Sequence, residues 1–211
     1  MTIRVLLADD HAVMRDGLQA LLQAAGSTVV AAVADGREAV RQALALRPDV
    51  VLMDIAMPQL NGVEAARLLR AKWPQARIVM LSMYADAEHV YQALAAGANG
   101  YVLKESAGAD VVAAVRAVHQ GKRYLSPPLA GLEQRAAQAH AASPLARLSS
   151  RERQVLQLVA EGHSSAEIAA RIHLSPKTVE TYRSRLMQKL GVSDRAALVK
   201  FAVQHGITSL T

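Results

Sequence analysis

The 211-residue sequence predicts an α/β domain with a five-stranded parallel sheet, followed by a small all-α domain of four helices. Five apolar runs alternate with five helical segments within residues 1–120, as in a parallel sheet covered on both faces. Four short segments with helix-capping signals occupy residues 149–206. Residues 1–120 contain 11 basic and 12 acidic residues, whereas residues 149–211 contain nine and five. This excess favours a polyanionic partner for the second domain, although a solvated basic surface is equally compatible with it.

Composition narrows the class of protein further. Hydrophobic residues make up 52% of the chain and aromatic residues only 3%, so its cores are expected to be aliphatic. There is no cysteine, which excludes disulfides and thiolate metal sites. The first residues, Met1–Arg4, show no signal-peptide pattern, and no apolar run approaches the roughly 18–20 residues that span a bilayer. We expect a soluble cytoplasmic protein without membrane association.

The elements of the first domain follow from apolar runs and helix stop signals. Val50–Met53 is typical of the strands: it is continuously apolar, as expected for burial on both faces. Helical segments have apolar residues three and four positions apart, and they end at Gly26, before Pro48, at Gly97 and at Gly121. The predicted strands are residues 3–8, 28–34, 50–53, 77–82 and 100–103, and the predicted helices are residues 12–25, 38–46, 63–72, 87–96 and 109–120.

Capping signals define four helices in the second domain. Two of them begin with a capping box, and a third begins with an N-cap serine followed by proline at the first helical position. The two middle helices are separated by about three residues, which is typical of a helix-turn-helix. The signals are carried by Ser149 with Glu152, Ser164 with Glu167, Ser175 with Pro176, and Ser193.

The segment between the domains has a different composition. Proline pairs with serine at Ser126–Pro128 and at Ser143–Pro144, and an Ala/Gln/Arg-rich stretch lies between them. This stretch, Leu129–Ala142, favours a helix but has little apolar periodicity. We therefore divide the chain into a first domain at 1–121, a linker carrying a marginal helix at 122–145, and a second domain at 146–211.

Polar residues stand where the apolar strands of the first domain end. The first strand is followed by Asp9 and Asp10, the third by Asp54, the fourth ends in Ser82, and the fifth is followed by Lys104. Parallel strands with right-handed connections bring these residues to one edge of the sheet. Three carboxylates there repel each other and require a cation, and oxygen ligands suit Mg²⁺, with Mn²⁺ as an alternative.

A lysine and a hydroxyl beside such a metal site can hold a tetrahedral anion. The set suits attack of Asp54 on a phosphoryl donor to give an acyl phosphate. For Asp54 alone, capping of the following helix is a fair alternative. A phosphatase with an aspartyl intermediate would need a second Asp two residues after the nucleophile, where this chain has Ala56. A flavin-binding domain would need a Ser/Thr/Gly-rich phosphate loop after the first strand, which has Asp9 and Asp10 instead.

Residues 3–121 closely resemble the receiver domain of two-component response regulators. The resemblance implies a flavodoxin-like fold with strand order 2-1-3-4-5 and phosphorylation of Asp54. It also implies Asp9, Asp10, Asp54 and the backbone carbonyl of Ala56 as Mg²⁺ ligands, Ser82 and Lys104 as phosphate contacts, and Tyr101 as an aromatic switch residue. The matching residues are Asp9-Asp10-His11, Asp54, Met57-Pro58 with Gly62, Ser82, Ala96-Gly97-Ala98 and Gly100-Tyr101-Val102-Leu103-Lys104.

The third helix of the second domain is the candidate DNA reader, because one face combines cations with short polar side chains. Residues 146–206 closely resemble the LuxR-type helix-turn-helix. The matching residues are Leu148-Ser149-Ser150-Arg151-Glu152-Arg153-Gln154-Val155-Leu156, Glu167-Ile168-Ala169, Lys177-Thr178-Val179-Glu180 and Lys189-Leu190-Gly191-Val192. By this resemblance the DNA contacts are Lys177, Thr178, Glu180, Thr181, Ser184, Arg185 and Lys189.

Together the two resemblances imply a response regulator of the NarL/FixJ family. A histidine kinase would phosphorylate Asp54 with Mg²⁺, and phosphorylation would promote dimerisation or release of the helix-turn-helix for binding to double-stranded promoter DNA. The expected partners are a cognate histidine kinase, promoter DNA and, in the active state, a second copy of the chain. We expect a phosphoacceptor and not an enzyme, with at most self-phosphorylation and self-dephosphorylation. A DNA-binding regulator that works independently of phosphorylation is the alternative.

Overall fold

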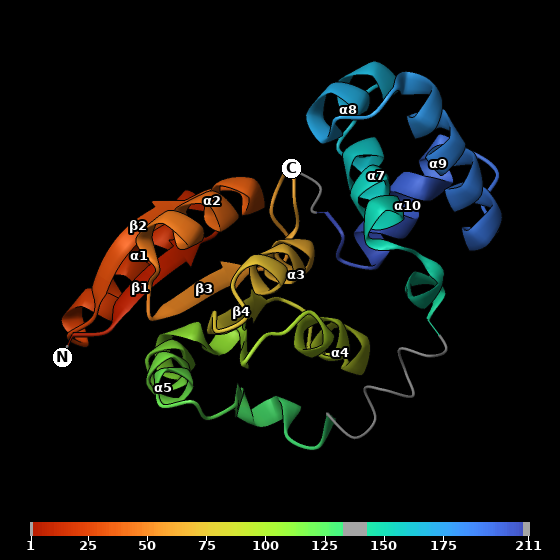
Figure 1. Cartoon of the computed structure of the whole chain (residues 1–211). Helices are drawn as coiled ribbons and strands as arrows, with labels where there is room; N and C mark the ends of the chain where they lie inside the picture. The colour runs from red at the N-terminus through yellow and green to blue at the C-terminus, as the bar shows by residue number, and fades with distance from the viewer. Residues whose placement is uncertain (1, 133–142, 209–211) are drawn as a thin grey trace. The chain divides into compact units, whose positions relative to one another are not determined.

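The computed structural model describes residues 2–132 and 143–208. The chain forms two compact units, Met1–His140 and Ala141–Thr211, which are coloured red to green and green to blue in Figure 1. No helix among the described residues is long and apolar enough to cross a membrane.

The first unit is built on a parallel six-stranded sheet with the order β2-β1-β3-β4-β5-β6. Its first five strands follow the expected order, and the sixth is an addition to the predicted five-stranded sheet. The sixth strand has two residues, and its partners are Gly100 and Tyr101 of β5. Such a strand leaves no apolar run in the sequence because it depends on a distant pairing. The strands are β1 Arg4–Ala8, β2 Thr28–Val33, β3 Val50–Asp54, β4 Ile78–Ser82, β5 Gly100–Leu103 and β6 Tyr124–Leu125.

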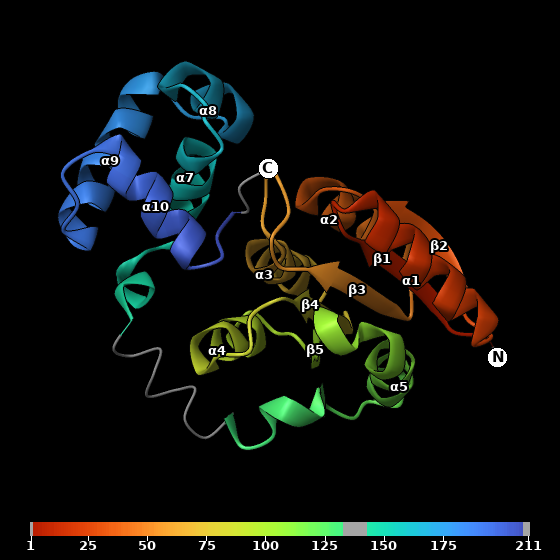
Figure 2. The same cartoon turned by 180° about the vertical axis from the view of Figure 1, so that it is seen from behind.

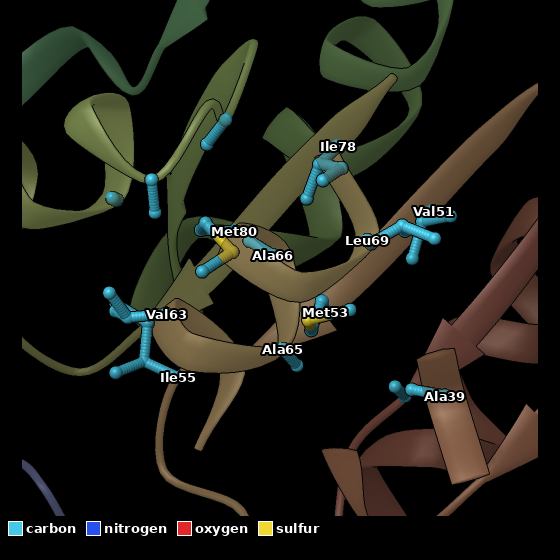
Figure 3. Packing of buried hydrophobic residues seen from close by; sticks show 14 of the residues in the cluster. Ala39, Val51, Met53, Ile55, Val63, Ala65, Ala66, Leu69, Ile78 and Met80 are labelled. Carbon is cyan, nitrogen blue, oxygen red and sulfur yellow. The ribbon is translucent and has the colours of Figure 1, made fainter. Parts of the chain in front are cut away.

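Among the described residues, five α-helices cover the two faces of this sheet. Helices α1 and α5 contribute to one buried apolar cluster, and α2, α3 and α4 contribute to the other. Figure 3 shows the second cluster, in which Ala66 and Leu69 of α3 lie beside Met80 of β4 and Val51 of β3. The sheet is thus packed on both faces, one apolar cluster on each, and this packing fixes the positions of the strand ends. The helices are α1 Ala12–Ala24, α2 Gly36–Leu46, α3 Gly62–Lys72, α4 Ala87–Ala95 and α5 Ala107–His119.

The helix that follows β3 is not capped by Asp54. Its N-cap is Asn61, whose Oδ1 atom accepts a hydrogen bond from the backbone N–H of Glu64 at 2.9 Å. Asp54 is the last residue of β3 and is separated from α3 by a loop. Helix capping as the role of Asp54 is therefore wrong.

The chain after α5 does not leave the first unit at once. After β6, the short 3₁₀ helix η2, Pro127–Leu129, follows directly. Leu129 is fully buried in the same apolar cluster as Tyr101. Residues 122–132, predicted as linker, thus pack on the sheet. Most of the marginal helix predicted over Leu129–Ala142 lies outside the described residues.

The second unit is a cluster of helices around an aliphatic core (Figure 2). Both predicted capping boxes are present, at Ser149 with Glu152 and at Ser164 with Glu167. The last helix is capped by Asp194, through the N–H of Ala197, and not by Ser193 as predicted. The elements are η3 Pro144–Arg147, α7 Ser150–Ala160, α8 Ser165–Ile172, α9 Pro176–Leu190 and α10 Arg195–Gln204.

Candidate functional site

The polar residues at the strand ends meet at the carboxyl edge of the sheet. Asp9 follows β1, Asp54 ends β3, Ser82 ends β4 and Lys104 follows β5. All four are buried, with 0% of Asp9 and 2% of Asp54 exposed. Asp10 is only partly buried. Three ionisable groups, those of Asp9, Asp54 and Lys104, are therefore concentrated where water can do little to screen them.

Lys104 is the cation that joins two of these carboxylates. Its Nζ atom lies 2.7 Å from Oδ2 of Asp54 and 2.9 Å from Oδ2 of Asp9. Burial lowers the pKa of Lys104, but the two carboxylates outweigh burial and raise it above its ordinary value. Lys104 thus stays charged, and its ammonium is placed to meet an anionic group carried by Asp54.

Asp54 has a strongly perturbed carboxyl group. Burial and, to a smaller extent, the negative charges of Asp9 and Asp10 raise its pKa, Lys104 opposes them, and the net result is a pKa of about 6. One lysine does not neutralise three neighbouring carboxylates. The site therefore has an excess of negative charge that a divalent cation would remove.

The donor atoms fit a hard cation. One ligand atom from each of Asp9, Asp10, His11 and Asp54 lies within 4.8 Å of the others. The Nδ1 atom of His11 lies 2.8 Å from Oδ1 of Asp10, and the His11 side chain is 62% exposed. The backbone N–H of His11 donates to Oδ1 of Asp9 at 2.9 Å. Carboxylate oxygens dominate this cluster, as Mg²⁺ and Mn²⁺ require.

Gly62 fixes the backbone behind Asp54. A Cβ atom at this position would lie 2.0 Å from the carbonyl oxygen of Asp54. The N–H of Gly62 donates to the carbonyl of Ile55 at 2.8 Å, which closes the loop between β3 and α3. Only a residue without a side chain allows this approach.

A chain of polar and aromatic contacts leads from Ser82 along the edge of the site. Oγ of Ser82 accepts from the N–H of Tyr84 at 3.0 Å, and the hydroxyl of the fully buried Tyr101 donates to the carbonyl of Tyr84 at 2.7 Å. The Tyr84 ring stacks on His89, with centroids 4.2 Å apart. Asp86 holds His89 through a 2.7 Å contact between Oδ2 and Nδ1. Asp86 and His89 were not singled out from the sequence. The only sequence signal for their contact is the three-residue spacing of a helix N-cap.

In the second unit, α9 buries Val179 and Leu186 and exposes the opposite face. A depression of about 350 Å³ on α9 is lined by Ser175, Lys177, Thr178, Thr181, Tyr182 and Arg185. Of the predicted DNA contacts, Lys177, Thr178, Thr181 and Arg185 line this depression, and Ser184 is exposed.

Two other predicted contacts are engaged within the unit. Nζ of Lys189 donates to Oε2 of Glu152 at 2.8 Å and to the carbonyl of Arg147 at 3.0 Å. This geometry makes Lys189 a brace between α9 and the start of α7. Glu180 accepts hydrogen bonds from Ser165 of α8 and, at 3.0 Å, from Arg183. Ser165 and Arg183 were not among the predicted contacts.

The comparisons with known proteins agree with both units. Residues 5–116 match the response regulator receiver domain, and residues 146–202 match the bacterial regulatory proteins of the luxR family. The chain belongs to the LuxR-family response regulators. It is therefore a phosphorylation-dependent, DNA-binding regulator of transcription, and the fold of each unit is the one expected for this family.

Relatives of this response regulator include the response regulator protein VraR of Staphylococcus aureus, which is 36% identical over 98% of this chain and 99% of its own. Among solved structures, a LuxR-family response regulator from Aurantimonas sp. is 37% identical over 67% of this chain and 99% of its own, with a TM-score of 0.61. RcsB of Salmonella enterica, solved bound to promoter DNA with the phosphomimetic BeF₃⁻, is 27% identical over 95% of this chain and 98% of its own, with a TM-score of 0.67.

Proposed function

We propose that Asp54 is the phosphoacceptor through which this regulator is switched. A histidine kinase, or a small acyl phosphate, donates the phosphoryl group to a carboxylate oxygen of Asp54. The contact between Lys104 and Asp54 carries the proposal, because it places a permanent cation where the new phosphoryl oxygens would form. Ser82, buried at the end of the next strand, would hold a further phosphoryl oxygen through its hydroxyl.

Asp9, Asp10, Asp54 and the backbone carbonyl of Ala56 would hold a Mg²⁺ ion, with Mn²⁺ as a substitute. When bound, the ion neutralises charge on the phosphoryl oxygens. The three carboxylates supply oxygen donors and an excess of negative charge, which is the fit that a hard cation needs. Lys104 would then compensate the negative charge of the acyl phosphate formed on Asp54.

Phosphorylation would replace the single negative charge of the Asp54 carboxylate with an acyl phosphate that carries about −1.5 to −2 charges. Lys104 and Ser82 would move toward those charges, and Tyr101 would report the change through its hydrogen bond to Tyr84. The expected result is dimerisation or release of the helix-turn-helix. We assign the chain no enzymatic role beyond its own phosphorylation and dephosphorylation.

The DNA-binding surface is the exposed face of α9. Lys177, Thr178 and Arg185 would contact phosphates, and Glu180, Thr181 and Ser184 would lie toward base edges of double-stranded promoter DNA. A dimer would bind two half-sites and gain affinity from their linkage. We place Lys189 outside this surface because its ammonium already braces α7. The functional divisions we propose are a receiver at 1–121, a linker at 122–145 whose first part, residues 122–132, packs on the receiver sheet, and a DNA-binding domain at 146–211.

The test is phosphorylation of the full chain with acetyl phosphate and Mg²⁺, followed on a gel that retards phosphoproteins. A retarded band is expected for the wild type and is expected to be lost in Asp54→Ala. A retarded band that survives Asp54→Ala would show that another residue is the acceptor. DNA affinity measured on the same samples should rise upon phosphorylation and fall steeply with salt.

A further inference from the structure

Ser126 is fully buried immediately after β6, within the segment predicted as linker. Three of its hydrogen bonds tie it to β5 and α5. Its N–H donates to the carbonyl of Tyr101 at 3.0 Å, and its Oγ atom accepts from the N–H of Leu103 at 3.1 Å. The same hydroxyl donates to Oδ2 of Asp110 at 2.5 Å. Ser126 thus holds both ends of the Tyr101–Leu103 stretch of β5.

Asp110 on α5 anchors Ser126. Its Oδ2 atom accepts a second hydrogen bond from Oγ of Ser106 at 2.8 Å, and only 8% of the residue is exposed. Burial raises the pKa of Asp110, but hydrogen bonds from Ser126, Ser106 and Tyr124 outweigh burial and lower the pKa. A buried carboxylate with several hydroxyl donors is rigidly placed, because losing any donor leaves charge without a partner.

This network encloses Lys104 on both sides along the chain. Leu103, which is bonded to Ser126, precedes Lys104, and the 3₁₀ helix η1, Lys104–Ser106, ends in the residue bonded to Asp110. The ammonium of Lys104 in turn contacts Asp54. A shift of Lys104 toward a phosphoryl group therefore strains the bonds of Ser126 and Asp110.

We infer that Asp110 and Ser126 are positioning residues for Lys104 and that they connect the phosphorylation state of Asp54 to residues 122–132. The inference rests on the proposed phosphorylation of Asp54. It adds the residues through which that phosphorylation would affect the chain beyond the site. Ser126 is both a support of β5 and part of the chain leading toward the second unit. A movement of β5 is thereby passed to that chain through hydrogen bonds that need no contact between the two units.

The direct test uses the unmodified full chain with and without Mg²⁺ and beryllofluoride, which mimics the phosphoryl group. Hydrogen exchange of the Leu103 and Ser126 amides should change by about tenfold or more when the mimic binds, because the free energy of local opening around them changes. The amide of Asp49, at the opposite edge of the sheet and bonded to the carbonyl of Arg4 at 2.8 Å, should stay unchanged. Unaltered exchange at Leu103 and Ser126, with the mimic bound, would overturn the inference.

Variants test the positioning role by comparing the maximal rate of phosphorylation with the half-saturating concentration of the phosphodonor. In Ser126→Ala and Asp110→Asn, the maximal rate of Asp54 phosphorylation by acetyl phosphate should fall by about tenfold, with the half-saturating donor concentration unchanged. Asp49→Asn serves as the matched control and should keep the wild-type rate. Wild-type rates in both folded variants would also overturn the inference. If the wild type itself were not phosphorylated, the proposed function would fail instead, and the two failures are therefore distinct.

Discussion

The Nζ atom of Lys104 lies 2.7 Å from Oδ2 of Asp54, across the carboxyl edge of the sheet. This single cation faces the carboxylates of Asp9 and Asp54, with Asp10 beside them, so the site is stable only as a balance between charges. The same arrangement that prepares Asp54 for reaction should therefore cost the fold stability when no metal is bound.

Stability without metal should rise as the pH falls. Asp54 has a pKa of about 6 in the folded protein against an ordinary value of 3.8, so the folded state binds more protons between these values. By linkage, unfolding free energy decreases as the pH rises from about 4 to about 6 and then levels off. Urea unfolding in EDTA should show this trend. Asp54→Asn should gain about 1–3 kcal/mol at pH 7 and lose that gain near pH 4. Equal pH profiles for the two proteins would contradict the assignment.

Removing a proposed metal ligand should weaken Mg²⁺ binding selectively. Asp9→Asn keeps the shape of the side chain but removes one buried negative charge from the cluster. Titration calorimetry should show at least about tenfold weaker binding. Even residues that only hydrogen-bond to metal ligands change metal affinity by about 10–100-fold when they are mutated. Asp49→Asn, at the other edge of the sheet, should bind Mg²⁺ as the wild type does. Undiminished affinity in Asp9→Asn would place the ion elsewhere.

Gly62→Ala should severely destabilise the receiver. The new Cβ atom would lie 2.0 Å from the backbone oxygen of Asp54, so β3 or the loop must shift. We expect a loss of about 3 kcal/mol or more, at the upper end of overpacking effects, measured by urea unfolding. Gly17→Ala in α1 is the control, because nothing lies within 4 Å of its Cβ position. That variant should gain about 0.5–1 kcal/mol.

Lys177 and Lys189 should differ in their effect on DNA binding. Lys177 is exposed beside the depression on α9, whereas Lys189 is bonded to Glu152. Lys177→Ala should reduce the slope of log affinity against log salt by about 1. Lys189→Ala should leave that slope unchanged and lower the stability of the second unit instead. Fluorescence anisotropy at several salt concentrations measures the slope, and a reduced slope for Lys189→Ala would return this residue to the DNA surface.

Glu180 should depend on Ser165 for its contribution to DNA specificity. Ser165 of α8 donates to its Oε1 atom across the turn, and Arg183 donates to the same atom from within α9, which limits the orientations of the carboxylate. Ser165→Ala should therefore reduce discrimination among half-site variants without changing non-specific affinity. Competition binding to a half-site library measures both quantities. Loss of non-specific affinity, or of thermal stability, would show that Ser165 acts only on the fold.

The order of the first five strands and of the α-helices around them could be predicted because each of these elements has a local signal. Val50–Met53 is continuously apolar, and Ser149 with Glu152 forms a complete capping box. The convergence of Asp9, Asp54 and Lys104 followed from parallel topology alone. Hydrogen bonds between residues far apart in the sequence had no such signal, so the roles of these residues could not be predicted. The brace from Lys189 to Glu152 spans 37 residues, and the bond from Leu103 to Ser126 spans 23.

The pairing of β6 with β5 also affects how the receiver can be isolated. A fragment that stops at Gly121, the limit suggested by the sequence, lacks Tyr124 and Leu125 and leaves the backbone of β5 unpaired along one side. Unpaired strand edges recruit other strands and promote aggregation. Such a fragment also uncovers the apolar surface that Leu129 buries. Self-association of that fragment would then result from the exposed edge of β5. It would carry no information about dimerisation in signalling.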